Sequence, residues 1–445
     1  MAMRKFLTEN GFVDVETPTL TRRTPGGARE FVAPCHVAPG KFYSLSQSPQ
    51  QFKQLLMVGG VDRYFQVARC YRDETGRPDR QPEFTQVDVE LSFTDRDSVM
   101  DMAERLVAAS WPEGFPRPRP PFTRMTHAEA LEKFGTDKPD LRFGCEIRDV
   151  TDMLNVGEDF LRNVFSKGCE AKCIHFSPTN ARALSKTELK QMESTAREPN
   201  FNYGGPLITS HFEVANDCDL KSSLLKKCSA STRKTFCDIV GLSPGDQGYV
   251  VIAERTKALN VAGKLRTELA HRLLEVDPTQ YSFLWVTDFP LFERSQTGSR
   301  LESTHHPFTR PRQEDLHLLD SDALAVRSDH YDLVLNGHEV AGGSMRINDA
   351  ALQERIISDF LGEDASALSH LIEALEYGCP PHGGIAFGLD RLVAVLVNAS
   401  SIRDVIAFPK TAEGKDPLFR APAEISTEEK DFYHIQVKRN DKENL

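Results

Sequence analysis

The dipeptide Asn336-Gly337 stands between two apolar runs in the segment from His330 to Ile347. Asparagine and glycine tolerate the left-handed backbone that a two-residue turn requires, so the pattern predicts an antiparallel β-hairpin. A turn at this place pairs Val334 with Glu339 and makes Asp332 a diagonal neighbour of Glu339, about 7 to 8 Å away at the backbone. Two carboxylates at that spacing can close on one Mg²⁺. Two acids on a solvent-facing strand would give the same pattern.

Arg346, near the end of the same segment, points away from those carboxylates if the strand alternates regularly. Gly342-Gly343 precedes it, and a glycine pair is a favourable place for a β-bulge. We therefore expect a bulge that turns Arg346 toward the face of Asp332 and Glu339.

A helix is predicted after Gln47, with Ser48 as N-cap, Pro49 in the first turn and Gly59-Gly60 beyond the end. Three apolar side chains share the face expected to pack on the core: Phe52, Leu55 and Leu56. Gln50 and Lys53 lie three residues apart on another face, where they can point together at a ligand. An ordinary surface helix explains this pattern as well.

Two strands are predicted from Arg63 to Arg72 and from Glu83 to Phe93, joined by a polar loop. The second alternates, with Val87, Val89 and Leu91 on one side. The other side carries Phe84, Gln86, Asp88 and Glu90. An exposed antiparallel edge strand gives this pattern about as often, but two carboxylates in line with Arg72 favour a site for a ligand that carries both charges.

A glycine-rich strand that begins at Gly383-Gly384 runs into a predicted helix at Gly388-Leu389-Asp390-Arg391. Glycine allows close approach of the backbone to a ligand, and a helix start attracts phosphate. Arginine at that position opposes the helix dipole. We therefore expect Arg391 to serve a nucleotide, with an ion pair to a carboxylate as the alternative.

The chain has 54 Lys and Arg against 65 Asp and Glu, a net charge of −11. This balance argues against a protein that coats nucleic acid, so such a partner would be held locally. No stretch approaches the roughly 18 apolar residues of a membrane helix, and the start lacks the apolar core of a signal peptide. The nine cysteines do not have zinc-ribbon spacing, which favours buried free thiols without a structural metal.

In combination these segments resemble the class II aminoacyl-tRNA synthetases over nearly the whole chain. The three signature motifs are matched by Pro18 after a helix and strand, by Phe65 to Arg72 with the loop to Phe84, and by Gly388 to Arg391. Aspartyl-tRNA synthetases of the bacterial type are matched at Gln47 to Gln50, His305 to Phe308 and Asn336 to Arg346. The resemblance implies an α+β fold, an antiparallel sheet flanked by helices, with an inserted α/β domain.

On this basis four parts are expected along the chain. Residues 1–142 and 280–420 form the catalytic domain, residues 143–279 form the inserted domain, and residues 421–445 form a partly disordered extension, being charged and poor in apolar residues. The N-terminal anticodon-binding domain of the family is expected to be absent. Two positions depart from the family pattern: Gly26 replaces a loop Glu that closes over the substrate ammonium, and Ala341 replaces a glycine.

The resemblance also assigns roles to individual residues. ATP would be bound by Arg72, Asp73, Glu74, Gln81, Phe84, Glu339, Gly388, Leu389, Asp390 and Arg391. Aspartate would be bound by Ser48, Gln50, Lys53, Arg72, Asp88, His305 and Arg346. Asp332 and Glu339 would hold Mg²⁺. Arg72 and Arg391 would be catalytic, because they offset the repulsion between the attacking carboxylate and the α-phosphate.

The activity so implied is that of an aspartate–tRNA ligase, with L-aspartate, ATP and tRNA(Asp) as partners and a homodimer as the assembly, without membrane or DNA. The Gly26 loop resembles animal mitochondrial members, which places the chain in the mitochondrial matrix; the cytoplasm is the alternative. Two other functions stay open. One is a tRNA-independent enzyme like the class II asparagine synthetases, and the other is a truncated paralogue that does not charge tRNA.

Overall fold

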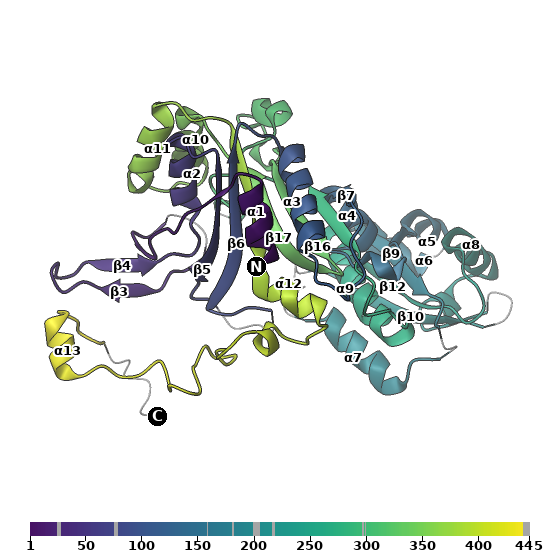
Figure 1. Ribbon diagram of the computed structural model, residues 1–445. Coiled ribbons are helices and arrows are strands. Elements are labelled where there is room, and N and C mark those ends of the chain that lie inside the picture. Colours follow the sequence, from purple (N-terminus) through teal and green to yellow (C-terminus); the bar gives the residue numbers. More distant parts are fainter. Residues whose placement is uncertain are drawn as a thin grey trace. The chain divides into compact units, whose positions relative to one another are not determined.

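The computed structural model of the chain describes residues 1–24, 28–74, 79–157, 159–179, 182–198, 205–215, 219–295, 298 and 300–438. The chain divides into two compact units (Figure 1). The first comprises Met1–Phe122, Asp288–Leu333 and Val340–Leu445. The second comprises Thr123–Thr287 and Val334–Glu339, so it overlaps the predicted insertion and extends beyond it at both ends.

A mostly antiparallel sheet runs through the first unit in the order β1-β5-β6-β18-β17-β16 (Figure 1). The strands are β1 (Val13–Asp14), β5 (Arg63–Tyr71), β6 (Glu83–Ser92), β16 (His330–Leu335), β17 (His338–Met345) and β18 (His382–Gly388). β1 pairs with β5 in parallel, whereas β5 with β6, β6 with β18 and β18 with β17 are antiparallel. The two strands predicted from Arg63 and from Glu83 are thereby confirmed, each to within a residue.

The predicted hairpin forms, with Asn336 at φ 51° and Gly337 at φ 83° between β16 and β17. Those left-handed angles are the ones that a two-residue turn of this kind needs. Against β18, β17 pairs without interruption from Ala341 to Met345. Against β16 the register shifts by one residue, because the two-residue turn sets Leu335 opposite His338 whereas the Met345 amide donates to Asp329 O. β17 therefore contains one extra residue relative to β16, as the predicted bulge requires.

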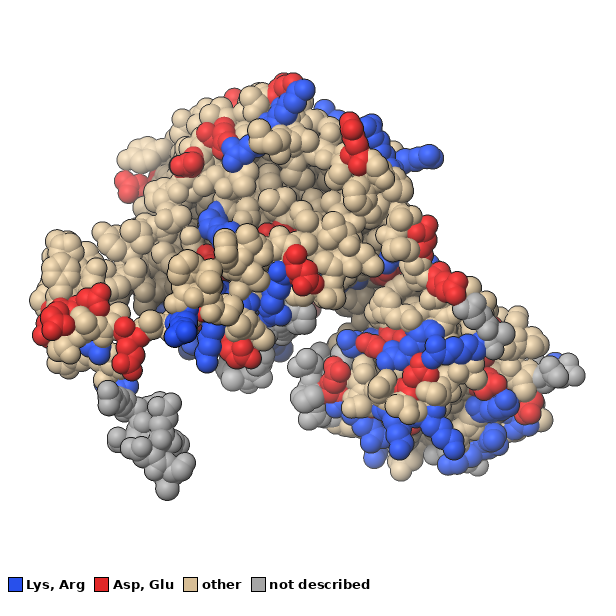
Figure 2. Space-filling view, turned by 60° about the horizontal axis from the view of Figure 1, so that its bottom comes forward, with Lys and Arg blue, Asp and Glu red and all other residues tan. Residues whose placement is uncertain are grey.

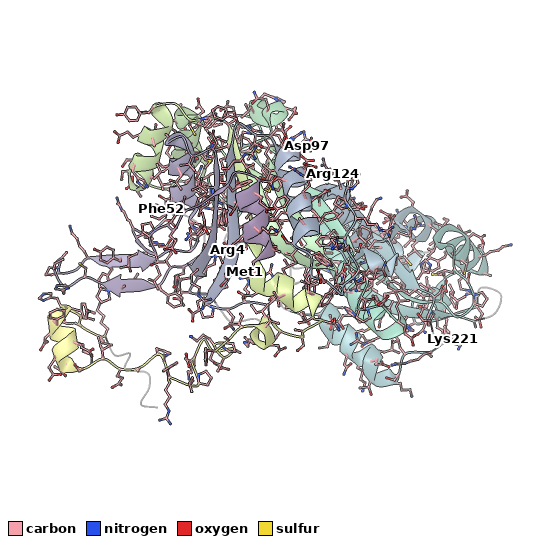
Figure 3. All side chains as sticks on the ribbon, in the orientation of Figure 1. Met1, Arg4, Phe52, Asp97, Arg124 and Lys221 are labelled. Atoms are coloured by element: carbon pink, nitrogen blue, oxygen red, sulfur yellow. The ribbon has the colours of Figure 1, made fainter. Side chains whose placement is uncertain are left out.

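Helices cover this sheet, and α2, α10 and α11 lie together at one side of it (Figure 1). The helices of the first unit are α1 (Ala2–Glu9), α2 (Gln50–Val58), α3 (Arg96–Ser110), α10 (Ala350–Arg355), α11 (Ser369–Glu376), α12 (Leu389–Leu396) and α13 (Thr427–Phe432). Asp95 caps α3 by accepting a hydrogen bond from the Ser98 amide. Arg4 on α1 forms an ion pair with Asp14 (Figure 3). The N-terminus of α3 is thus stabilised by a side-chain cap of the usual kind.

Smaller elements complete the first unit. β2 (Leu20–Thr21), β3 (Val32–Pro34) and β4 (Phe42–Leu45) form a separate sheet in the order β2-β4-β3, and β14 (Phe292–Arg294) pairs with β15 (Leu301–Ser303). Short helical turns occur at Gln313–Leu318, Ala323–Ala325, Ile356–Phe360, Ala365–Leu368 and Ile402–Val405. In the predicted extension, Phe432 of α13 stacks on His36 with centroids 4.9 Å apart; residues 439–445 lie outside the described part.

The second unit contains an antiparallel sheet in the order β11-β10-β12-β9-β8. Its strands are β8 (Arg148–Asp149), β9 (Cys169–Phe176), β10 (Ile208–Val214), β11 (Leu220–Ser222) and β12 (Gln247–Glu254), and β7 (Thr123–Thr126) pairs in parallel with β13 (Phe283–Thr287). Its helices are α4 (His127–Phe134), α5 (Thr151–Gly157), α6 (Asp159–Phe165), α7 (Lys186–Ala196), α8 (Ala230–Val240) and α9 (Arg255–Leu273), with short turns at Leu141–Phe143 and Leu225–Lys227.

Alternate residues of β12 enter two different apolar clusters. Tyr249 and Val251 belong to the cluster that includes residues of α7 and α9, whereas Val250 and Ile252 belong to the cluster that includes residues of α5 and α8. Both faces of the strand are therefore buried, which explains why its sequence is an unbroken apolar run.

The described helices are all too short or too polar to cross a membrane. Five cysteines are buried: Cys70, Cys169, Cys173, Cys228 and Cys237. Basic and acidic side chains are interspersed on the face shown in Figure 2.

Candidate active site

Helix α2 turns its polar side inward. Pro49 takes the N-cap position, so the helix begins one residue later than predicted and Ser48 does not cap it. Its buried side chains are Gln50, Lys53, Gln54 and Met57. The residues expected to face the core are only half-buried: Phe52, Leu55 and Leu56. The predicted core face is confirmed in part, since Leu55 packs against the core cluster that includes Phe308. The most deeply buried side is nevertheless the polar one, because Lys53 pairs with carboxylates on β6.

Those carboxylates are Asp88 and Glu90. Lys53 Nζ hydrogen-bonds Asp88 Oδ1 and lies 3.1 Å from Glu90 Oε2. Arg346 donates to both oxygens of Glu90, from Nε at 2.9 Å and from Nη2 at 3.2 Å. All four side chains are at most 5% exposed. Two buried cations thus balance two buried carboxylates, and this set is called the charge cluster below.

The register of β17 with β18 brings Arg346 to the cluster. Ser344 pairs with Gly384, which in turn pairs with Glu90, so the three residues form one row across the sheet. Arg346 follows Ser344 by two residues and donates from Nη1 to Ser344 Oγ at 2.6 Å. Regular alternation therefore brings the guanidinium to the face of Glu90.

Gly384 makes room for Glu90. A Cβ at position 384 would lie 2.1 Å from Glu90 Oε2, closer than any non-bonded contact allows. The glycine-rich pattern predicted a close approach of a ligand to the backbone at this position. The structure shows instead that Gly384 accommodates a carboxylate of the protein.

Burial and pairing act in opposite directions on the two acids. Burial raises the pKa of Glu90, but Arg346 and Lys53 outweigh it and lower that pKa to about 2. For Asp88, burial outweighs the attraction of Lys53 and the pKa is raised above its ordinary value. Glu90 is therefore the firmly ionised member of the cluster.

Replacing Glu90 by glutamine is expected to lower the free energy of unfolding at neutral pH by on the order of 3 kcal/mol, because two buried cations then face one carboxylate. The pKa of Glu90 is lowered from 4.5 to about 2. Its contribution is therefore complete above pH 4.5 and is lost as the pH falls toward 2. Urea unfolding across that range, with the exposed Glu9→Gln as control, measures it. A parent–variant difference that stayed constant down to acid pH would contradict the assignment.

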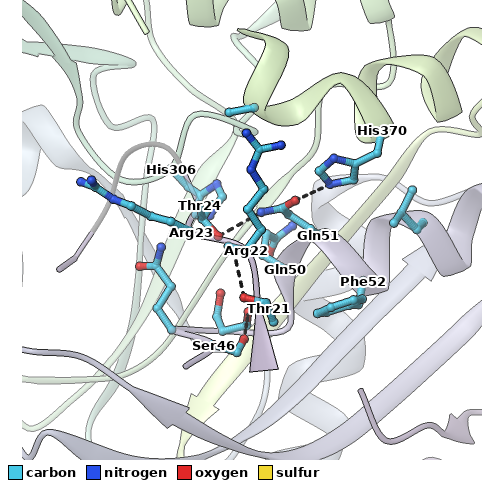
Figure 4. A pocket seen from close by; sticks show the side chains of 14 residues that line it. Thr21, Arg22, Arg23, Thr24, Ser46, Gln50, Gln51, Phe52, His306 and His370 are labelled. Atoms are coloured by element: carbon cyan, nitrogen blue, oxygen red, sulfur yellow. Dashed lines mark hydrogen bonds between the residues drawn. The ribbon is translucent and has the colours of Figure 1, made fainter. Parts of the chain in front are cut away.

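A cavity of about 210 Å³ opens beside the cluster, lined among others by Ser48, Gln50 and His306 (Figure 4). Gln51 donates to Thr24 Oγ1 at 2.9 Å and accepts from His370 Nε2 at 2.7 Å (Figure 4). Within the described residues Gln50 Nε2 is buried with no hydrogen-bond partner. A buried donor left without a partner costs free energy unless a ligand accepts from it.

His306 is a site residue to which the sequence analysis gave no role. Burial lowers its pKa well below the ordinary value, and the nearby cations Arg346, Lys53 and Arg72 lower it further. The imidazole is therefore neutral at physiological pH. The only sequence signal for it was its place next to His305 in the motif of the resembling family.

His305 lines a different cavity, of about 390 Å³, together with Arg300, Glu302 and Pro307. Its ring stacks on His330. The role of His305 toward the aspartate carboxylate stays a prediction.

Arg72 has a buried donor, Nε, for which the described residues supply no acceptor. The guanidinium carbon lies 5.0 Å from the centroid of the half-buried Phe84 ring, a cation–π contact that fixes both side chains. The Arg72 amide donates to Pro82 O at 2.8 Å, which anchors the loop. An anion is the group best suited to accept a hydrogen bond from such a donor.

The loop after Arg72 is tied to a distant segment. Asp73 and Glu74 are exposed, and Arg80 donates to Glu74 Oε2 at 2.6 Å. Gln81 donates to Lys410 O at 3.1 Å and accepts from the Lys410 amide at 2.8 Å. Both ends of the Gln81 amide are thus held by protein backbone, and its contact with ATP stays a prediction.

Helix α12 carries the last predicted constellation. Gly388 is the N-cap and Leu389, Asp390 and Arg391 form the first turn, as predicted. Asp390 accepts a hydrogen bond from the Thr85 amide at 2.9 Å, which ties α12 to β6 beside Phe84. Arg391 Nη2 lies 3.6 Å from the exposed Asp79. Arg391 therefore has a carboxylate partner, which was the alternative to a nucleotide. The pair lies on the surface, where an ion pair is weak and a substrate can replace Asp79.

The predicted metal ligands have different surroundings. Asp332 is buried and accepts from His330 Nε2 at 2.8 Å. Donor atoms of His305, His330 and Asp332 all lie within 4.8 Å of one another. Glu339 Oε2, at the hairpin end that belongs to the second unit, lies 3.8 Å from Lys138 Nζ. The carboxylate oxygens suit Mg²⁺, and the shared site stays a prediction. The Gly26 position lies outside the described residues.

The family model of the class II tRNA synthetases (D, K and N) matches residues 1–412. The chain belongs to this family. The mitochondrial aspartate–tRNA ligases of Rattus norvegicus and Homo sapiens are each 48% identical to this class II synthetase, over 98% and 99% of its length and 67% and 68% of theirs. The aspartate–tRNA(Asp/Asn) ligase of Caldanaerobacter subterraneus subsp. tengcongensis is 42% identical over 98% of this chain and 73% of its own length.

Membership in the class II tRNA synthetases confirms the resemblance and the α+β fold inferred from the motifs. The three signature motifs that carried the inference lie in the first unit: Pro18, Phe65 to Arg72 with the loop to Phe84 at the start of β6, and Gly388 to Arg391 at the start of α12. The hydrogen bond from the Thr85 amide to Asp390 joins the last two of these regions directly.

Proposed function

We propose that this chain is an aspartate–tRNA ligase, which activates L-aspartate with ATP and transfers the aspartyl group to the 3′ end of tRNA(Asp). The observation that carries the proposal is the match of nearly the whole chain to aspartate–tRNA ligases at 48% identity. The buried, unpartnered Nε of Arg72 next to Phe84 supports it, since an adenine nucleotide offers both a phosphate and a ring.

The charges of the first unit suit the charges of free aspartate. Aspartate has two carboxylates and one ammonium. The side-chain carboxylate is assigned to Lys53 and Arg346, the ammonium to Asp88 with Ser48 and Gln50, and the α-carboxylate to Arg72. Because Lys53 already pairs with Asp88, the substrate can separate the two and pair with each. The site then loses one ion pair and gains two, which offsets part of the desolvation cost.

In the first step an α-carboxylate oxygen of aspartate attacks the α-phosphorus of ATP. The new oxygen–phosphorus bond forms as the bond to the bridging oxygen of the β-phosphate breaks, and pyrophosphate leaves. The nucleophile is already ionised, so no general base is required. Arg72 and Arg391 are proposed to spread the charge of the transition state. In the second step a ribose hydroxyl of tRNA attacks the mixed anhydride and AMP leaves.

Mg²⁺ is the metal proposed for Asp332 and Glu339, where it would neutralise phosphate charge.

A homodimer is the proposed assembly. The first unit exposes apolar side chains on β3 and β4, with Val32 65% and Phe42 51% exposed, which supports an interface there. The mitochondrial matrix is the proposed compartment, because the relatives at 48% identity are mitochondrial enzymes.

Aspartate-dependent exchange of labelled pyrophosphate into ATP tests the first step, and charging of tRNA(Asp) tests the second. We expect both. Charging of tRNA(Asn), measured in parallel, tests whether the chain also accepts the second tRNA that is named for the Caldanaerobacter relative. Exchange with ammonia-dependent formation of asparagine and no charging would favour the tRNA-independent alternative. A folded protein without exchange would favour a non-catalytic paralogue.

A further inference from the structure

His330 occupies the first position of β16 and has no role in the assignments above. Its ring lies parallel to that of His305, with centroids 3.5 Å apart and planes 8° apart. Phe289 meets both rings edge-on, at 4.7 Å from His305 and 5.0 Å from His330. The plane of the His330 ring is therefore fixed by aromatic contacts on two sides.

The same ring contacts Asp332. His330 Nε2 and Asp332 Oδ1 are 2.8 Å apart, and a carboxylate only accepts, so the imidazole donates. His330 is 7% exposed and Asp332 is 6% exposed. A buried hydrogen bond to a charged group restricts the orientation of the carboxylate strongly.

We propose that His330 is a positioning residue of the adenylation site, which sets the Asp332 carboxylate through its Nε2–H and the His305 ring through the stack. The inference rests on the proposed function, in which Asp332 binds Mg²⁺ and His305 contacts aspartate. Carboxylates that bind metals are held in this way by hydrogen bonds from behind, and the loss of such a partner weakens metal binding about 10- to 100-fold.

The two contacts of His330 can be removed separately. His330→Phe keeps an aromatic ring for the stack on His305 but has no donor for Asp332. His330→Gln keeps an Nε2 donor at similar reach but has no ring. The exposed His317, on the turn Gln313–Leu318, supplies the matched control His317→Phe.

With His330→Phe we expect the Mg²⁺ concentration for half-maximal exchange to rise at least about tenfold, while KM for aspartate stays near that of the parent. With His330→Gln we expect the reverse, a raised KM for aspartate and an unchanged Mg²⁺ requirement. Calorimetric titration with MgATP, without aspartate, should show the same loss of affinity for His330→Phe alone. In an Asp332→Asn background, His330→Phe should add nothing to the Mg²⁺ requirement.

The inference is overturned if both variants lower activity and melting temperature together, with the Mg²⁺ requirement and KM unchanged, because His330 would then only pack. It is also overturned if His330→Phe and Asp332→Asn act additively. Failure of the proposed function has a different signature. The parent would lack aspartate-dependent exchange, while calorimetry would still distinguish His330→Phe from His330→Gln in MgATP binding.

Discussion

Replacing Arg72 by alanine is expected to lower aspartate-dependent pyrophosphate exchange at least about 100-fold, the effect of removing one electrostatic stabiliser from a transition state. The guanidinium has a buried Nε without a protein partner in the described structure, so its donor is available to the reacting carboxylate and phosphate. The loss should appear mainly in kcat, because the charge that Arg72 offsets is greatest in the transition state. Arg391→Ala is expected to lose a comparable factor.

A neighbouring arginine supplies the control. Arg69 lies on β5, which ends one residue before Arg72; it is 43% exposed and pairs with Glu83 at 3.2 Å. Arg69→Ala removes the same charge and side chain but should leave exchange near the parent value. Near-normal exchange in Arg72→Ala, or an equal loss in Arg69→Ala, would show that the α-phosphate is held elsewhere.

Changing Lys53 to methionine is expected to abolish most aspartate activation and to narrow the preference for aspartate over asparagine. The two amino acids have nearly the same shape, so selection depends on charge. Without Lys53 the cluster retains Asp88 and Glu90 against one cation, and a further carboxylate is repelled. A buried charge that loses its partner costs about 3 to 5 kcal/mol, which corresponds to more than about a hundredfold in kcat/KM for aspartate.

Exchange kinetics with both amino acids measure this preference, for the parent, Lys53→Met and Arg346→Gln. The exposed Lys41→Met is the matched control. Because unbalanced carboxylates also threaten folding, a second variant that adds Asp88→Asn to Lys53→Met restores the balance; it should recover the melting temperature but not aspartate activation. An unchanged preference ratio in both single variants would place the carboxylate pocket elsewhere.

Local sequence patterns predicted helices and strands well where the turn residues and the alternation of a strand determine the structure by themselves. Asn336-Gly337 predicted its hairpin because few other residues adopt the turn, and the alternation of β6 predicted which side chains share a face. Helix α2 was different. Its apolar residues indicated one buried face, but the free energy of pairing Lys53 with carboxylates on another strand decided the orientation. A single segment contains no information on that partner.

The candidate site shows the same division. The motifs identified Lys53, Asp88 and Arg346 individually, but the pairing of Arg346 with Glu90 depends on the register of three strands. Gly384 was assigned to a ligand because the carboxylate that needs its space is nearly 300 positions away in the sequence. His306 acquires its environment from Lys53, Arg72 and Arg346, which lie in three other segments of the chain. No pattern within its own segment indicates that environment.

The bonds between Gln81 and Lys410 have a consequence for the order in which the protein matures on the ribosome. Their partners are 329 residues apart, so Lys410 is synthesised long after Gln81. The loop after Arg72 that is proposed to bind ATP therefore lacks this anchor until Lys410 has been made. Nascent chains that already fold their sheet should bind nucleotide poorly until this segment has left the exit tunnel. Ribosome-bound chains arrested before and after that point would reveal the change.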